Sequence, residues 1–372
     1  MKKVCFLSLG SYSLLNSRDN NLDYGGAEVR QVLIGRALAK KGFDICFITY
    51  DNAPSRTPSN QTSIVDGISV IKSFCVSTKI PLIKRFAILW KCLKQANSDI
   101  YLHSSGFPGI VPLYCLVYRK KFILLISSDR NAVLRNIVSS TSFITKIALY
   151  LDIKLSDIVV VQNTFQMHSI EQNFKKTPHL IYNPIKTSEL PKLSNTYDKK
   201  TVIWIGTIEE IKQPSLLIEL AKSLPDYYFK VIGRCSVNEP AVCKWFLSEI
   251  ESVPNLSYLG FMPQGKLKSV YQEASILINT SIAEGFPNTF LEAWLYGVPV
   301  VSLNVDPDEI ICKNHLGFHS KTIKQMITDI DTLLKNESLL TDCGRNCQLY
   351  VKSIHDLDKI IDDYVVILNC LH

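Results

Sequence analysis

The segment 274–303 constrains the fold of this chain more than any other part of it. It begins with an apolar strand over Ala274–Asn279, which is followed by a turn that contains glycine and proline. A helix is predicted to start at Asn288 or Thr289, because both residue types are good helix N-caps. A Gly-Val-Pro sequence ends that helix, and a second apolar strand follows over Val298–Leu303. The segment therefore predicts a βαβ unit of an open α/β sheet, in which ligands bind at the carboxyl ends of the strands.

The turn of this unit has the residue types of an anion site. Its helix start offers free backbone N–H groups and the positive end of the helix dipole, and Gly285 allows a ligand to come close. A phosphate could sit on Asn288 and Thr289. Because the carboxylates of Glu284 and Glu292 would repel a phosphate, each must face another part of the ligand, with ribose at Glu292 and a second polyol at Glu284. This pattern describes a nucleotide sugar; the alternative is that Glu284 is a solvated loop residue and Glu292 only caps the helix dipole.

The same residues resemble the signature of the retaining glycosyltransferases of family 4. In that signature two acids with seven residues between them are followed by Gly-x-Pro-Val-Val, as Glu284 and Glu292 are followed here by Gly297-Val-Pro-Val-Val. Pro287, after Phe286, replaces the usual second glycine, a variant common in branches that build bacterial surface polysaccharides. The resemblance implies the GT-B fold, an α/β architecture of two Rossmann-like doubly wound domains facing across a cleft.

The resemblance covers nearly the whole chain and is strongest over 201–305. The family has an arginine and then a lysine at the end of a strand, and both cations bind the donor diphosphate. Lys212 matches the lysine, whereas Thr207 stands where the arginine is expected, so one of the two cations is missing. Arg234, at the end of a later strand, could partly replace it. The turn that begins at Phe261 borders the base in the family.

The N-terminal half also contains residues that match the family. Gly25 and Gly26 follow a strand and precede a helix; such a pair is more often only a tight turn, but the family has one at the N-terminal wall of the cleft. His103 lies where family members often have a histidine near the donor sugar, and the alternative is a loop residue that forms hydrogen bonds. Asp129 follows a buried strand and is either an acceptor-side residue or a helix N-cap.

A chain of 372 residues is long enough for two or three domains. We expect an acceptor domain over 1–185 and a nucleotide-sugar domain over 186–355, which starts with a polar linker over 186–200. A final segment, 356–372, is expected to form a helix that crosses back to the first domain.

Composition and charge narrow the classes of partner. The formal charge of +7 suits an anionic ligand or an anionic membrane surface, and no basic run with interleaved aromatic residues predicts nucleic-acid binding. The segment 80–94 is either a basic amphipathic helix on a membrane or, as we favour, an ordinary helix packed on the sheet. Polar residues interrupt the first apolar run, so it predicts a strand and not a signal peptide. No apolar run reaches about eighteen residues, so we predict no membrane span. The chain is expected to be cytoplasmic, with peripheral attachment to the inner face of a membrane as a further option.

Cysteine spacing and one acidic string bear on metals. The eleven cysteines include no Cys-x-x-Cys, and four of them lie in apolar runs: Cys5, Cys46, Cys115 and Cys243. They predict buried free thiols in a reducing compartment, not zinc ligands or a disulfide framework. Asp306-Pro-Asp308 matches the Asp-x-Asp string of GT-A enzymes, but a three-residue string is weak, and we expect a loop at the cleft with no metal.

These features predict an enzyme that transfers a sugar from a nucleotide diphosphate sugar to an acceptor hydroxyl with retention. The acceptor would be a sugar or a lipid-linked glycan, and no cofactor or metal would be required. Lys212 and the helix start would stabilise the departing diphosphate, with Glu284 as the second catalytic residue. Two alternatives remain open: a sugar phosphorylase or synthase on the same fold, and a non-catalytic GT-B subunit. Thr207 favours the subunit, whereas Lys212, Glu284 and Glu292 argue against it.

Overall fold

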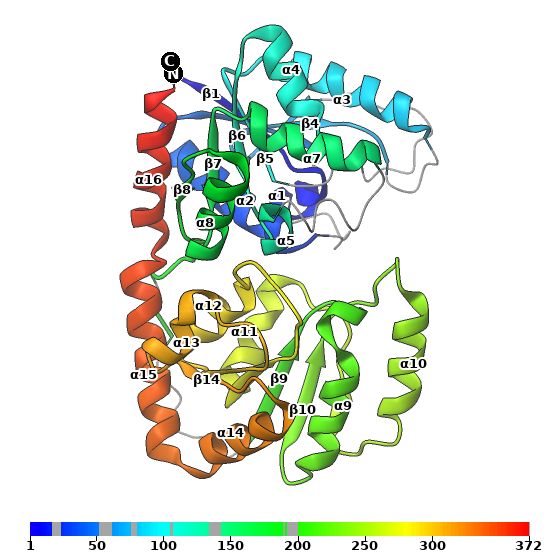
Figure 1. Cartoon of the computed structure of the whole chain (residues 1–372), viewed down its shortest axis with the longest axis vertical. Helices are drawn as coiled ribbons and strands as arrows, with labels where there is room; N and C mark the ends of the chain where they lie inside the picture. Colours follow the sequence, from blue (N-terminus) through cyan, green and yellow to red (C-terminus); the bar gives the residue numbers. More distant parts are fainter. Residues whose placement is uncertain are drawn as a thin grey trace. The chain divides into compact units, whose positions relative to one another are not determined.

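The computed structural model describes residues 1–16, 24–51, 62–75, 80–104, 107–133, 143–188, 190–191 and 200–371. The chain divides into two compact units. The first unit combines Met1–Pro184 with Leu357–His372, and the second unit is Ile185–Asp356. Each unit is built on its own sheet of largely parallel strands with helices on its faces, which confirms the predicted α/β class (Figure 1).

The first unit contains an eight-stranded sheet of order β3-β4-β2-β1-β5-β6-β7-β8, in which only β3 is antiparallel to its neighbour among the described strands. Its central strands are buried along nearly their whole length, as continuous apolar runs in parallel sheets require. The elements are β1 (Lys3–Leu7), η1 (Leu9–Ser11), α1 (Tyr12–Leu15), α2 (Gly26–Lys40), β2 (Asp44–Thr49), β3 (Thr62–Val65), β4 (Ile68–Lys72), α3 (Leu82–Ala96), β5 (Ile100–His103), α4 (Ile110–Tyr118), β6 (Lys121–Leu125), α5 (Asp129–Ala132), α7 (Phe143–Leu155), β7 (Ile158–Val161), α8 (Thr164–Phe174), β8 (His179–Leu180) and α16 (Leu357–Cys370).

Helix α16, the last of the chain, belongs to the first unit and packs on α2 (Figure 1). Its apolar stripe, which includes Ile361, Tyr364 and Leu368, is fully buried in the core formed with β1 and β2. The ammonium of Lys2 donates to the carbonyls of Leu368 at 2.9 Å and of Leu371 at 2.8 Å. The two ends of the described chain therefore lie together.

The second unit contains a six-stranded parallel sheet of order β11-β10-β9-β12-β13-β14. The chain adds β10 and β11 on one side of β9, and then returns to place β12 on the other side. The elements are β9 (Thr201–Ile205), η2 (Glu210–Lys212), α9 (Pro214–Ser223), β10 (Tyr228–Ile232), α10 (Pro240–Ile250), β11 (Leu256–Tyr258), α11 (Gln264–Glu273), β12 (Ile276–Asn279), α12 (Asn288–Leu295), β13 (Val300–Ser302), η3 (Pro307–Glu309), α13 (Ile310–Lys313), β14 (Gly317–His319), α14 (Ile323–Lys335) and α15 (Glu337–Ile354).

The predicted βαβ unit is present as β12, α12 and β13, with strands shorter than expected. Ala274 caps the end of α11, and the N–H of Val298 bonds to Ala293 O at 2.9 Å, so both residues close helices before the strands begin. Helix α12 begins at Asn288, as predicted, but its N-cap is Pro287. Its inner face buries Phe290, Leu291, Ala293 and Trp294.

The cysteines differ from the prediction. Cys235, after β10, forms a disulfide with Cys243 in the first turn of α10, so Cys243 is not a free thiol. Cys312 and Cys370 are exposed and Cys75 is half-buried, although most of the other free cysteines are buried as expected. The pairing depends on where α10 begins relative to β10, which cysteine spacing does not reveal.

Two other predictions concern the surface and the linker. Residues 189 and 192–199 of the predicted linker lie outside the described residues.

Helix α3 packs its inner face on the core of the first unit, as favoured. Leu82 and Ile83 at its start are nevertheless 62% and 83% exposed, beside an exposed Lys84. None of the described helices has both the length and the apolar character to cross a membrane.

Candidate active site

The strand order of the second unit places a ligand site between β9 and β12. In an open parallel sheet, ligands bind where neighbouring strands lead to connections on opposite sides, and β9 and β12 are such a pair. Lys212 lies in the connection after β9, and Glu284 lies in the connection after β12. Two of the predicted site residues are thus brought to one point by the fold.

The Lys212 ammonium and the Glu284 carboxylate form an ion pair, with Nζ 2.8 Å from Oε1. The same oxygen accepts hydrogen bonds from Asn279 Nδ2 at 3.0 Å and from the Ser281 hydroxyl at 2.7 Å. Burial raises the pKa of Glu284, but the Lys212 charge and these hydrogen bonds outweigh burial and lower it. The carboxylate is therefore held in its charged form, and its side chain is only 17% exposed. This placement does not fit a solvated loop residue.

The backbone around this pair is fixed by a second set of bonds. The Thr280 hydroxyl donates to the carbonyl of Lys212 at 2.6 Å and accepts from Trp204 Nε1 at 3.0 Å. The N–H of Ile282 donates to Ile211 O at 2.9 Å. The polar run Asn279-Thr280-Ser281 at the end of a buried strand is the sequence signal for these partners, but the run alone does not specify which atoms bond.

The anion turn leads into α12, whose first residues, Asn288 and Thr289, are half-buried. Gly285 and Pro287 are buried. Phe286 is also buried, and its ring lies 5.0 Å from the His355 ring between centroids, so its side chain serves the core. The helix start itself retains the N–H groups and the dipole that favour an anion.

Glu292 has a different partner from Glu284. Its Oε2 accepts a hydrogen bond from the Tyr271 hydroxyl at 2.8 Å. Tyr271 is fully buried and stacks on Tyr296, with ring centroids 5.5 Å apart. Burial first, and then the Glu292 carboxylate, raise the pKa of Tyr271, so this phenol stays protonated as a donor. The two acids therefore sit in separate local environments, one cationic and one phenolic.

Three further predicted residues lie at the same edge of the sheet. Thr207 follows β9, Arg234 follows β10 and Phe261 follows β11. Beyond the strand ends the chains stay paired, because Ile208 N donates to Arg234 O at 2.8 Å. This close approach needs glycine at position 233, since a β-carbon there would lie 1.6 Å from the Gly206 carbonyl oxygen. Arg234 is thus held on the strand next to Thr207.

Glu209 also belongs to this group of charges, although no sequence motif marks it. Burial raises its pKa, as do the carboxylates of Glu239 and Glu284, against the opposite effects of Lys212 and Arg234. The two cations of the site are therefore partly balanced by acids when no anion is bound.

A pocket of about 470 Å³ adjoins the site within the second unit. Its volume lies in the range that small-molecule sites typically have. The lining residues come from η2, the start of α9, the N-terminal half of α10 and the loop after β12: Glu210, Gln213, Pro214, Ser215, Ala241, Val242, Trp245 and Ile282.

A separate cavity of about 230 Å³ in the first unit contains His103. Nδ1 of His103 lies 3.2 Å from Leu7 O, and Nε2 has no hydrogen-bond partner among the described residues. Burial lowers the pKa of His103 to about 4, so the ring is neutral near pH 7. Asp152 also lines the cavity and accepts the Gly109 N–H at 2.9 Å. Burial raises the pKa of Asp152 to about 7 against this bond.

Gly25 and Gly26 lie at the start of α2. Gly25 is the N-cap of the helix, and its N–H donates to Glu28 Oε2 at 3.0 Å. This bond satisfies one backbone donor at the helix start.

Asp129 is the first residue of α5, and Ser128 is the N-cap of that helix. The alternative in which Asp129 is a helix N-cap is therefore wrong. Asp129 Oδ1 accepts from Asn163 Nδ2 at 3.0 Å and from Gln166 Nε2 at 2.8 Å. The carboxylate therefore joins α5 to the start of α8.

Comparison with known proteins places these observations in a family context. Residues 186–349 match the family described as "Glycosyl transferases group 1". A protein of Haemophilus influenzae described as an uncharacterized glycosyltransferase is 25% identical over 92% of this chain and 96% of its own length. Sucrose-phosphate synthase from Thermosynechococcus elongatus has a similar structure, with a TM-score of 0.81 and 15% identity over 100% of this chain and 99% of its own. Anabaena HepE in complex with UDP and glucose matches over 100% of both chains, with a TM-score of 0.75 and 15% identity. These structures confirm the GT-B fold.

Proposed function

We propose that this chain, which has the GT-B fold and a group 1 glycosyl transferase domain in its second unit, transfers a sugar from a nucleotide diphosphate sugar to an acceptor hydroxyl. Transfer proceeds with retention of the anomeric configuration and serves surface polysaccharide or glycolipid assembly. The observation that carries the proposal is the Lys212–Glu284 ion pair, 2.8 Å long, at the point between β9 and β12 where a parallel sheet binds ligands.

Charge at this point matches what the reaction needs. As the bond to the sugar breaks, negative charge develops on the departing diphosphate. The Lys212 ammonium and the N–H groups at the start of α12 stabilise that charge, an effect that is usually the largest in such sites. Glu284, with its pKa lowered, keeps Lys212 in position and faces the sugar. The leaving phosphate oxygen takes the proton of the acceptor hydroxyl, so the scheme uses neither a separate base nor a metal.

The nucleoside half of the donor is assigned to Glu292. Its carboxylate accepts a bond from Tyr271 on one oxygen, an arrangement that orients the group toward the hydroxyls of a ribose. Because the Anabaena relative was solved with UDP and glucose, uridine diphosphate sugars are the first donors to test. Thr207 and Arg234 supply the edge of the diphosphate site, and Phe261 supplies the edge of the base site.

The first unit is assigned to the acceptor. The cavity with neutral His103 and buried Asp152 offers polar atoms in an apolar lining, which suits a hydroxyl of a sugar or of a lipid-linked glycan. Gly25, Gly26 and Asp129 belong to the same unit. The exposed apolar start of α3, next to Lys84, is the surface that would lie on the anionic inner face of a membrane.

A thermal-shift screen against nucleotide sugars tests the proposal, because a ligand that binds only the folded state raises the melting temperature. We expect a uridine diphosphate sugar to stabilise the protein and to be turned over with a suitable acceptor. NMR of the product then reports the anomeric configuration. Formation of a sugar phosphate from inorganic phosphate would instead identify a phosphorylase. Tight nucleotide binding without turnover of any donor would favour a non-catalytic subunit, as Thr207 in place of arginine suggests.

A further inference from the structure

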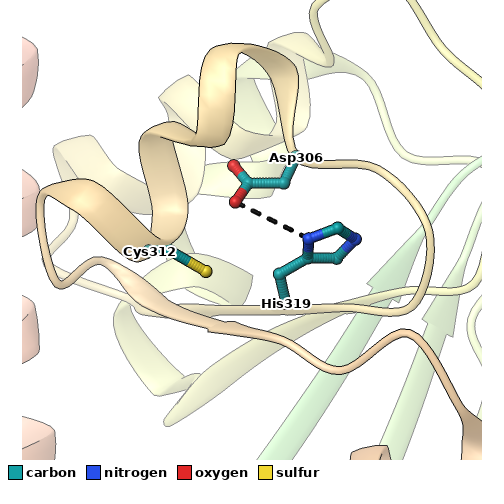
Figure 2. Close-up of side chains that lie close together, drawn as sticks. All are labelled: Asp306, Cys312 and His319. Carbon is teal, nitrogen blue, oxygen red and sulfur yellow. Dashed lines mark ion pairs between the residues drawn. The ribbon is translucent and has the colours of Figure 1, made fainter.

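A cluster of three chemically different side chains lies at the carboxyl ends of β13 and β14, at the edge of the sheet farthest from β11. Asp306 precedes η3, Cys312 lies on α13, and His319 ends β14, so three elements contribute one residue each (Figure 2). One ligand atom of each residue lies within 4.8 Å of those of the other two. Among the described residues, these three side chains are the histidine, cysteine and acidic groups that lie close enough together to share one metal ion.

The Asp306 carboxylate is the least exposed member of the cluster. Its side chain is 1% exposed, and its Oδ1 accepts the Ile311 N–H at 2.8 Å. Its Oδ2 faces His319 Nδ1 at 3.8 Å, beyond hydrogen-bonding distance, and the Cys312 thiol and backbone N–H are further hydrogen-bond donors to the carboxylate (Figure 2). A buried carboxylate is costly unless its charge is compensated, so this position favours a cation.

The fold presents His319 to Asp306 through a close approach of two strands. Gly317 has φ +136°, and a β-carbon there would lie 2.0 Å from the Val300 carbonyl oxygen. Glycine therefore allows β14 to lie against β13, with His319 in register with Ser302. Cys312 is exposed on α13, which leaves the cluster open to solvent from that side.

We propose that Asp306, Cys312 and His319 form a zinc site. A thiolate, an imidazole nitrogen and a carboxylate oxygen are the three ligand types that Zn²⁺ accepts, whereas Mg²⁺ and Ca²⁺ prefer oxygen ligands alone. Tetrahedral zinc, with bonds of about 2.0–2.3 Å, places its ligands roughly 3.3–3.6 Å apart, so the side chains close by about 1 Å on binding. The Cys312 thiol releases its proton to solvent when the Zn–S bond forms, and water occupies the fourth position.

The site goes beyond the proposed transfer chemistry and does not depend on it. A bound ion would fix the segment between β13 and β14, which includes Asn304. Asn304 Nδ2 donates to Ser281 O at 3.2 Å, and the Ser281 hydroxyl bonds to Glu284. Zinc would thus stabilise a loop that supports the Lys212–Glu284 pair without contacting the reacting groups. Asp308, the second acid of the Asp-x-Asp string, is not a member of the cluster.

Titration of the whole chain with Co²⁺, after removal of metals by a chelator and in a phosphine reductant, tests the site. Cobalt replaces zinc and reports thiolate ligation as a near-ultraviolet charge-transfer band. We expect one equivalent to bind with this band and with the visible bands of four-coordinate cobalt, and Zn²⁺ to displace it. Cys312→Ser should remove the charge-transfer band, and Cys312→Ser, His319→Gln and Asp306→Asn should each weaken binding about tenfold or more.

Two matched variants serve as controls. Cys370→Ser removes another exposed free thiol, and Asp308→Asn removes the other acid of the string; both should bind cobalt as the wild type does. Equal binding and an equal charge-transfer band in Cys312→Ser, or no such band in the wild type, would overturn the proposal and leave Asp306 and His319 as an ion pair beside α13. If Asp306→Asn does not fold, the exposed Cys312 and the less buried His319 still decide the outcome.

Discussion

Lys212 and Glu284 follow different strands, yet their side chains meet at 2.8 Å with Glu284 Oε1 as the shared acceptor. The pair keeps a carboxylate charged in a position where burial alone would raise its pKa. Lys212 therefore keeps Glu284 charged, and a substitution of Lys212 should change the pKa of the Glu284 carboxyl.

Lys212→Met should reverse the pH dependence that Glu284 contributes to stability. In the wild type the pKa of Glu284 is lowered, so its stabilisation is present above its ordinary value of 4.5 and is lost as the pH falls through the lowered pKa. Without Lys212, burial should raise the pKa, and the contribution should then decrease as the pH rises. We also expect the free energy of unfolding at pH 7 to fall by about 1–3 kcal/mol.

Thermal unfolding of Lys212→Met between pH 3 and 8 measures this effect. Lys230→Met is the matched control, because it removes a more exposed ion pair with Glu273 in the same unit. The control should leave the pH profile nearly unchanged. Identical profiles for both variants would mean that Lys212 does not set the charge of Glu284.

The two acids should separate binding from turnover. Glu284→Ala should leave nucleoside diphosphate binding nearly intact and lower kcat on the order of tenfold, or roughly 1.4 kcal/mol, because the contact to the sugar strengthens as the sugar departs. Glu292→Ala should mainly raise KM, and it should weaken the binding of the bare nucleoside diphosphate by about 1.5–3 kcal/mol. Tyr271→Phe, which removes only the hydrogen bond to Glu292, should show a smaller effect of the Glu292 type.

Steady-state kinetics and calorimetry of these variants distinguish the roles. If both alanine variants changed kcat and KM in the same proportion, the two acids would not lie on opposite sides of the diphosphate. Unchanged calorimetric affinity in Glu292→Ala would remove the ribose assignment.

Metal removal should affect stability and leave transfer intact. The proposed chemistry uses Lys212 and the start of α12, whereas the proposed zinc site would fix the segment between β13 and β14. A site filled at a hundredfold excess of metal over Kd stabilises the fold by about 2.7 kcal/mol, so treatment with EDTA should lower the melting temperature while turnover persists. Loss of turnover with EDTA and its recovery with Mn²⁺ would instead place a metal in the reaction.

The exposed start of α3 should determine attachment to anionic vesicles. Ile83 is 83% exposed next to Lys84. Burial of the Ile83 side chain in the lipid interface and attraction of the Lys84 ammonium to anionic lipid should both favour binding to the vesicle. Ile83→Glu should abolish sedimentation with vesicles that contain phosphatidylglycerol. Ile64→Glu, at another strongly exposed position of the first unit, should not. Equal sedimentation of both variants would exclude α3 as the membrane surface.

The fold class, and the position of the turn that carries Glu284, follow from local patterns in the sequence. The apolar strand before Glu284 and the helix after it specify a βαβ unit, and such units place polar residues at the carboxyl end of a parallel sheet. Helix α12 begins at Asn288, within the predicted start, although its N-cap is Pro287 and neither of the two predicted capping residues. The polar run at 279–281 also carried the partners of Glu284, but only the structure shows which atoms bond.

Features that depend on the approach of distant segments could not be predicted. The Cys235–Cys243 disulfide requires the first turn of α10 to face the loop after β10, and no cysteine spacing encodes this. The grouping of Asp306 with His319 depends on Gly317, whose missing side chain lets β14 reach β13. In each case the chemistry resides in residues that the sequence shows, and the proximity arises from backbone packing.

The placement of α16 bears on the order in which the protein is made. Because Ile361, Tyr364 and Leu368 complete the core of the first unit, that core stays incomplete until α16 has left the ribosome. The second unit, whose residues are continuous in sequence, can fold earlier during synthesis although it is translated later than β1–β8. A premature stop just before Leu357 would therefore damage the first unit, whose strands are translated first, and would spare the second unit, which directly precedes the stop.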